Sequence, residues 1–155
     1  EKEAFLHSPK SLVIRTNVFG ANLKTDRASF AEWVLYSLKN RKPIRLFTDY
    51  IFSPIVGLRL GHIIWQLVRK DHEGIINVGS LNPCSKYEFG RALASAGGFD
   101  ERILIKASLE DHKAFFLREK DISLDVENLI KLGISPPTYQ ESIQEFLKEH
   151  FSEVR

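Results

Sequence analysis

Short runs rich in β-branched residues alternate with longer amphipathic segments along this chain, and this alternation limits the possible folds more than any other feature. Residues 11–16, 44–47 and 74–79 are predicted to be strands, because short apolar runs of this kind suit strands covered on both faces. Shorter extended segments are expected at 103–105 and 121–125. Strands separated by helical connections favour parallel crossovers. The sequence therefore predicts an α/β fold.

Helices are predicted where apolar residues recur every three or four positions between start and stop signals. On this pattern Trp33 and Val68 belong to the buried faces of their helices, and glycines at 97–98 and 133 end two of the others. The predicted helices are residues 25–41, 58–70, 85–97, 125–132 and a closing helix after 138. Three begin with capping-box pairs, in which a serine or threonine precedes a glutamate by three positions. These pairs are Ser29 with Glu32, Ser85 with Glu88 and Thr138 with Glu141.

The charge balance and the single cysteine narrow the class of protein. The chain has 22 Lys and Arg against 20 Asp and Glu, and a net charge of +2 gives no basic stripe for nucleic acid. Its longest nearly apolar stretch, residues 60–68, is far shorter than the roughly 20 residues of a membrane span. Because Cys84 has no cysteine to pair with, a cytoplasmic location is expected. Neither nucleic acid nor a membrane is an expected partner.

No complete active site can be recognised in the sequence. It contains neither a G-x-G-x-x-G nor a G-x-x-x-x-G-K-[ST] phosphate loop, and its five histidines are too scattered to predict a metal site. No tyrosine is followed four positions later by lysine, the pair in which the lysine charge lowers the pKa of the phenol for proton transfer. Cys84 precedes a helix N-cap, which favours a thiolate, but a hydrophobic staple with Phe89 explains its position better. Catalysis by this chain alone is not expected.

Four motifs, in order, carry a resemblance to a known family. They are LVIRTNVFG (12–20), LFTDYIFSP (46–54), GIINVGS (74–80) with SKYEFG (85–90), and REKDISLD (118–125). Together they resemble the dTDP-4-dehydrorhamnose reductase family and its relatives among the extended short-chain dehydrogenase/reductases and sugar-nucleotide epimerases.

The resemblance implies a fold and an incomplete domain. Residues 1–155 would be a single C-terminal substrate-binding region: the C-terminal portion of a Rossmann-type parallel sheet plus a small mixed α/β substrate-binding lobe. The dinucleotide-binding part, with the glycine-rich loop and the Tyr-x-x-x-Lys pair, would lie upstream. The full-length protein would use NAD or NADP, with no cofactor expected for this chain alone. Its expected partners are a nucleotide-linked sugar, the missing N-terminal Rossmann half and, as a further option, a second copy in a homodimer.

The implied function is substrate binding in an NAD(P)-dependent reductase of a 4-keto-6-deoxy sugar nucleotide. Three alternatives stay open: a nucleotide-sugar epimerase, a non-catalytic regulatory subunit with the same fold, and an independent protein-interaction domain. An upstream glycine-rich loop and Tyr-x-x-x-Lys pair would separate the enzymes from the regulatory subunit. An interaction domain would instead fold well alone, without an exposed apolar face.

Two loops are the predicted substrate site. Asn17 and Phe19 leave a strand at its C-terminal end, where open α/β sheets place ligands, and an amide beside an aromatic ring suits a sugar or a base. A turn residue and a core aromatic are the alternative readings of this pair. The loop of residues 48–54 combines hydrogen-bonding groups with apolar surface, and a proline fixes its backbone. Its predicted substrate contacts are Thr48, Asp49, Phe52, Ser53 and Pro54.

The resemblance also places Thr16 and Asn17 near the cofactor. Arg118 could bind a diphosphate bidentately, or form a solvated salt bridge with Glu119. The Arg-Glu sequence at 118–119 departs from the Arg-Pro of the family. Arg59 is a second departure, because a cation in the first turn of a helix opposes the helix dipole. Either that helix begins later than position 58, or the site differs from the family pattern.

Overall fold

A three-stranded parallel sheet organises one half of the molecule. The computed structural model describes residues 1–21, 28–111 and 119–152. In it β1 (Leu12–Phe19) is the central strand between β4 (Pro54–Val56) and β5 (Gly74–Val78). The strand β5 pairs with the first part of β1, up to Thr16, whereas β4 pairs with its last three residues. The carboxyl end of β1 is therefore hydrogen-bonded to β4, which begins directly after residue 53.

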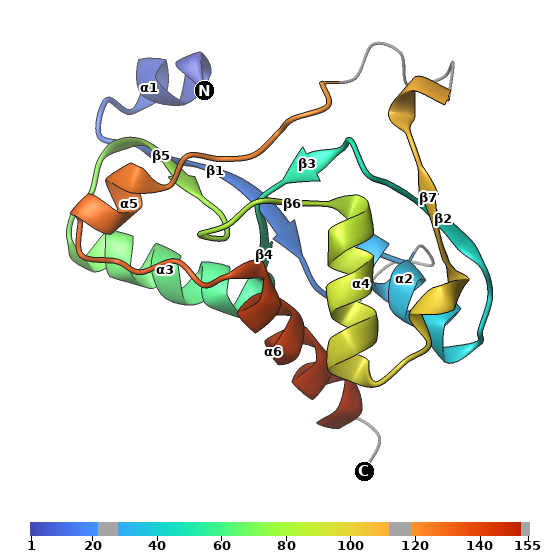
Figure 1. Cartoon of the computed structure of the whole chain (residues 1–155). Helices are drawn as coiled ribbons and strands as arrows, with labels where there is room; N and C mark the ends of the chain where they lie inside the picture. Colours follow the sequence, from blue (N-terminus) through green and yellow to red (C-terminus); the bar gives the residue numbers. More distant parts are fainter. Residues whose placement is uncertain (22–27, 112–118, 153–155) are drawn as a thin grey trace.

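Two small two-stranded sheets form the other half (Figure 1). The strand β2 (Ile44–Phe47) is parallel to β7 (Leu104–Ala107), and β3 (Ile51–Phe52) is antiparallel to β6 (Cys84–Ser85). The strand β2 has the predicted bounds. The segment predicted as a loop at 48–54 contains β3 and the first residue of β4, because its backbone groups find partners far along the chain. These pairings make the segment a rigid part of the fold.

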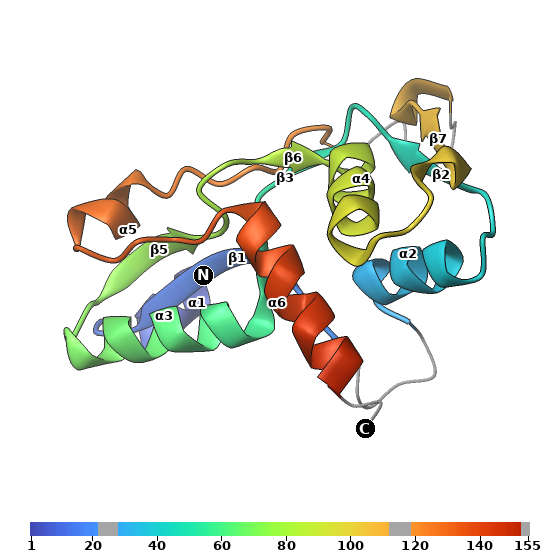
Figure 2. The ribbon, with the colours of Figure 1, turned by 60° about the horizontal axis from the view of Figure 1, so that its bottom comes forward.

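Helices pack around these sheets (Figures 1 and 2). They are α1 (Lys2–His7), α2 (Phe30–Lys39), α3 (Gly57–Arg69), α4 (Lys86–Gly97), α5 (Glu127–Lys131) and α6 (Tyr139–Ser152). Two 3-10 turns, η1 (Glu101–Ile103) and η2 (Leu109–Asp111), flank β7. All three predicted capping boxes are present: in each, the hydroxyl accepts the backbone N–H of the glutamate, and the glutamate accepts that of the cap residue. Among the described residues no helix is long and apolar enough to cross a membrane.

The core consists of two apolar clusters. The larger one is centred on Phe89 and Phe146 and joins α2, α4 and α6 to β2 and β7. The smaller one lies between the three-stranded sheet, α3 and α5, and contains Ile76 and Leu129. The helix α4 contacts both α2 and α6, which places it at the centre of the larger cluster.

Several sequence predictions need correction. Helix α2 begins at Phe30 rather than at 25, with Ser29 already extended; residues 25–27 lie outside the described residues. Trp33 and Val68 are 41% and 59% exposed, because the buried faces of their helices are narrower than the apolar pattern suggested. The segment 121–125, expected only to be extended, makes one isolated β-bridge, from Asp121 to Ile51.

Candidate functional site

The carboxyl end of β1 is tied to Ser53 by a side chain predicted to bind substrate. The Oδ1 atom of Asn17 accepts the backbone N–H of Ser53 at 2.9 Å. The Nδ2 group of Asn17 has no hydrogen-bond partner in the described part of the chain. It therefore remains a donor for a ligand. Asn17 also pairs in register with Pro54. The structure thus brings together three residues of the two predicted loops.

Ser53 itself is a fully buried junction. Its carbonyl accepts the backbone N–H of Ser80 at 3.3 Å, and its hydroxyl oxygen accepts that of Leu124 at 3.0 Å. With the bond from its own N–H to Asn17, Ser53 connects β1, the turn after β5 and the segment before α5. These contacts hold the loops in place, and the direct contact of Ser53 with substrate stays a prediction.

Phe19 and Phe52 occupy the core beside this junction. They are 8% and 4% exposed, and both contact Phe89, with ring centroids 5.1 and 5.7 Å apart. The alternative reading of Phe19 as a core aromatic matches this geometry. Neither ring offers a free face to a ligand, so these two residues form the floor of the site rather than its surface.

Thr16 lies one residue before Asn17, on the opposite face of the sheet. It is in register with Val78, which is fully buried in the smaller core cluster. The Thr16 hydroxyl is buried and has no hydrogen-bond partner among the described residues. Of the two predicted cofactor contacts, Asn17 offers a donor at the strand end and Thr16 an unpaired hydroxyl behind it.

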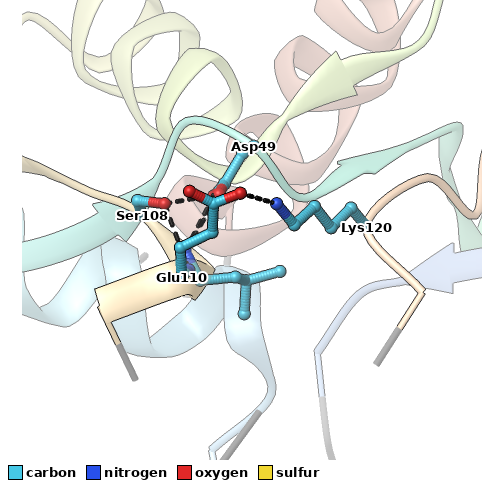
Figure 3. A network of polar contacts seen from close by, with 5 residues as sticks. Asp49, Ser108, Glu110 and Lys120 are labelled. Carbon is cyan, nitrogen blue, oxygen red and sulfur yellow. Dashed lines mark hydrogen bonds and ion pairs between the residues drawn. The ribbon is translucent and has the colours of Figure 1, made fainter. Parts of the chain in front are cut away.

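Asp49 binds the chain around η2 instead of pointing into a cleft (Figure 3). Its carboxylate accepts the Ser108 hydroxyl at 2.6 Å and the Leu109 backbone N–H at 2.9 Å. Burial by itself would raise the pKa of Asp49, but these hydrogen bonds and the nearby Lys120 ammonium outweigh it and leave the pKa lowered. Thr48 adds a bond from its backbone N–H to the Ala107 carbonyl at 2.9 Å. Both residues join β2 to β7 and its turn.

We expect the Asp49→Ala substitution to lower the free energy of unfolding by about 1–3 kcal/mol at neutral pH, because two donors lose a charged acceptor. A carboxylate whose pKa is lowered by folding stabilises above its unfolded pKa, and this contribution disappears as the pH falls through its folded value. The difference between wild type and variant should therefore shrink below about pH 4. Urea unfolding at pH 7 and pH 3 measures this. Glu149→Ala, at an exposed glutamate near the end of α6, is the control, and an equal difference at both pH values would contradict the assignment.

Arg118 lies outside the described residues. The chain on either side of it is held by an ion pair between Glu110 and Lys120 (Figure 3).

Cys84 is structural rather than reactive. Its side chain is 2% exposed, and burial raises the pKa of its thiol to about 12, so the thiolate is not formed at neutral pH. It belongs to the same cluster as Phe89, as the staple reading predicted. Within residues 1–21, 28–111 and 119–152 no group of three metal-ligating side chains occurs.

Lys86 is a feature of the site that the sequence did not reveal. It is the first residue of α4, and its Nζ atom lies 3.4 Å from the ring centroid of Phe52 and 4.2 Å from that of Phe30. Burial lowers the pKa of this ammonium to about 8. The rings come from α2 and β3, so no local pattern around position 86 could have indicated them.

A depression lies elsewhere, lined by residues of α4, of the turn after it and of α6. Its volume is about 520 Å³. Two of its lining residues, Arg91 and Glu101, form an ion pair with Nε and Oε2 at 3.0 Å. None of the predicted site residues lines this depression, so we place the candidate site at the Asn17–Ser53 junction. The lining residues are Glu88, Arg91, Ala92, Ser95, Phe99, Glu101 and Tyr139.

Comparison with known proteins places this geometry in a family. Residues 1–152 match the family model described as the RmlD substrate binding domain. No curated protein matches the chain. Among solved structures it is similar to the dTDP-4-dehydrorhamnose reductase of Bacillus anthracis in complex with NADP, at 23% identity and a TM-score of 0.77, over 89% of this chain and 48% of that one.

Two further structures extend the likeness. An ortholog of the reductase from Clostridium acetobutylicum is 19% identical, with a TM-score of 0.79 over 94% of this chain and 51% of its own. The dTDP-glucose 4,6-dehydratase of Bacillus anthracis in complex with NAD is 13% identical, with a TM-score of 0.72 over 97% of this chain and 49% of its own. The chain thus spans about half the length of the solved structures it matches, and at these identities the likeness concerns the fold.

Proposed function

This chain belongs to the family of RmlD substrate binding domains, and we propose that it is the substrate-binding part of an NAD- or NADP-dependent reductase acting on a 4-keto-6-deoxy sugar nucleotide. The observation that carries the proposal is the Asn17–Ser53 junction at the carboxyl end of β1. Ligands of open α/β sheets bind outside the carboxyl ends of the strands. The free Nδ2 donor of Asn17 is suited to a hydroxyl or carbonyl oxygen of such a ligand.

The proposed enzyme also needs a dinucleotide-binding half. A dinucleotide-binding half would precede this chain and bring the general acid and the nicotinamide, which supplies the hydride when bound. Solved relatives that share this fold were crystallised with NADP and with NAD. Asn17 is the residue with which this chain would reach the cofactor or the adjoining sugar. We expect the protein to act in the cytoplasm, since its single cysteine is buried and unpaired.

An Asn17→Ala variant of the full-length protein tests this site. Because the variant loses both the donor to the ligand and the acceptor that positions Ser53, we expect kcat/KM to fall about 10- to 100-fold. The assay follows oxidation of NADPH or NADH in the presence of dTDP-4-dehydrorhamnose. The matched control is Asn40→Ala, at the exposed C-terminus of α2, where the side chain bonds only to the Tyr36 carbonyl at 2.7 Å.

Two results would contradict the proposal. The site assignment fails if Asn17→Ala turns over as fast as Asn40→Ala at every substrate concentration. The reductase assignment fails if the wild-type protein oxidises neither nicotinamide with any 4-keto sugar nucleotide. Ligand binding without turnover would instead indicate the non-catalytic subunit.

A further inference from the structure

Lys86 is the first residue of α4 and directly follows β6, whose passage into α4 can be followed in Figure 1. The strand β6 pairs with β3, so that Cys84 lies opposite Phe52 and Ser85 opposite Ile51. The backbone N–H of Lys86 donates to the Tyr50 carbonyl at 3.2 Å, which fixes the start of the side chain. Phe52 directly precedes Ser53 in the chain, so the ammonium lies over the ring next to the Asn17–Ser53 junction.

Three aromatic rings surround this ammonium. Besides the rings of Phe52 and Phe30, that of Tyr50 has its centroid 5.5 Å from Nζ. Ring faces attract a cation, but they carry no net charge. Lys86, Phe30 and Tyr50 are each partly exposed. The ammonium thus lies among three aromatic rings, here called the aromatic recess, and two of these rings belong to partly exposed residues.

The positive charge is not neutralised within the described part of the chain. No carboxylate there forms an ion pair with Lys86, and the acidic group nearest in sequence, Glu88, accepts the Ser85 backbone N–H at 2.7 Å. Lys86 also occupies the first position of a 12-residue helix, where the helix dipole disfavours a cation. Burial also disfavours the charged form of Lys86, which lowers its pKa. A ligand anion beside Lys86 would supply the missing negative charge, and it would offset both the unfavourable helix dipole and the cost of burying the ammonium.

We propose that Lys86 is a ligand-contacting residue that binds the diphosphate of the nucleotide-linked substrate, an inference that rests on the proposed function. The ammonium donates hydrogen bonds to a phosphate oxygen, and the aromatic recess keeps the side chain from swinging into solvent. On this proposal Asn17 and Lys86 contact different parts of one ligand. A charge-assisted hydrogen bond of this kind is stronger than one between neutral groups.

The test measures dTDP binding to the full-length protein by calorimetry. Lys86→Met should raise the Kd about tenfold or more, the loss expected for one charge-assisted contact, and Lys86→Arg should recover part of the affinity. Lys106→Met is the matched control, because the Lys106 ammonium also lies 5.5 Å from a ring centroid, that of Tyr87, but is exposed. Trace acetylation of the wild-type protein gives a second readout: dTDP should protect Lys86 and leave Lys106 reactive.

A failure of the Lys86 contact can be distinguished from a failure of the proposed function. If the wild type binds dTDP, and Lys86→Met binds it as tightly as Lys106→Met does, Lys86 does not contact the ligand. The same holds if dTDP leaves the acetylation of Lys86 unchanged, a result that does not depend on the folding of any variant. If the wild type binds neither dTDP nor a sugar nucleotide, the proposed function fails and this inference fails with it.

Discussion

We expect a Gly79→Ala variant to lose about 3 kcal/mol of unfolding free energy, the upper part of the range for overpacking a buried site. A Cβ atom at position 79 would lie 2.8 Å from the Ser53 Cβ and 2.9 Å from the Ser53 carbonyl oxygen. Contacts this short force a movement, and Ser53 cannot easily provide one. Its N–H, carbonyl and hydroxyl are bound to three different segments, so displacing it breaks the junction with Asn17.

The control for this substitution is another glycine of the same chain. A Cβ atom at Gly61, within α3, would meet nothing within 4 Å, so Gly61→Ala should stabilise by about 0.5–1 kcal/mol through helix propensity. Urea unfolding of both variants, followed by circular dichroism, gives the comparison. Equal midpoints for Gly79→Ala and wild type would show that Ser53 is free to move. The junction would then be too loose to position a ligand.

The sequence predicted best those features that depend on neighbouring residues. The capping boxes that begin with Ser29, Ser85 and Thr138 are fixed by side chains three positions apart, and all three are confirmed. Gly98 and Gly133 adopt positive φ angles of 68° and 74° at the helix ends, as their predicted role as stop signals requires. Local signals of this kind need no knowledge of the tertiary structure.

Contacts between distant segments were beyond such reasoning. Asp49 bonds to Ser108, 59 positions away, and this partner turns a predicted ligand contact into a link between β2 and β7. The two-residue strands β3 and β6 are too short to give a periodic pattern. The aromatic recess around Lys86 depends on that pairing, so it too appears only in the folded chain.

Arg59 shows how a tertiary contact resolves a local conflict. The helix α3 begins at Gly57, so Arg59 does lie in its first turn, where the dipole disfavours it. The Arg59 Nε atom donates to the Glu145 Oε1 atom on α6 at 2.7 Å. This bond raises the pKa of Arg59 and supplies the negative charge that the first turn of α3 lacks. Of the two explanations that the sequence allowed, a later helix start is wrong.

The Phe89→Ala substitution should cost about 3–5 kcal/mol, as removal of a buried phenylalanine typically does. Phe89 is fully buried, and its ring lies 5.1, 5.5 and 5.7 Å from the centroids of Phe19, Phe30 and Phe52. Edge and tilted contacts between rings add to the loss of buried area. Since a domain of this size is stable by only about 5–15 kcal/mol, the variant should lose a large fraction of its stability.

The Phe89→Ala substitution should also displace the aromatic rings that lie beneath the candidate site. Removing the ring of Phe89 leaves a void under Phe30 and Phe52, the two rings closest to the Lys86 ammonium. Phe89→Leu fills part of that void and should retain roughly half of the lost stability. Tyr36→Ala, at a side chain 61% exposed on α2, should change the urea midpoint very little. If Phe89→Ala is no less stable than Tyr36→Ala, the aromatic cluster does not stabilise the fold around the candidate site.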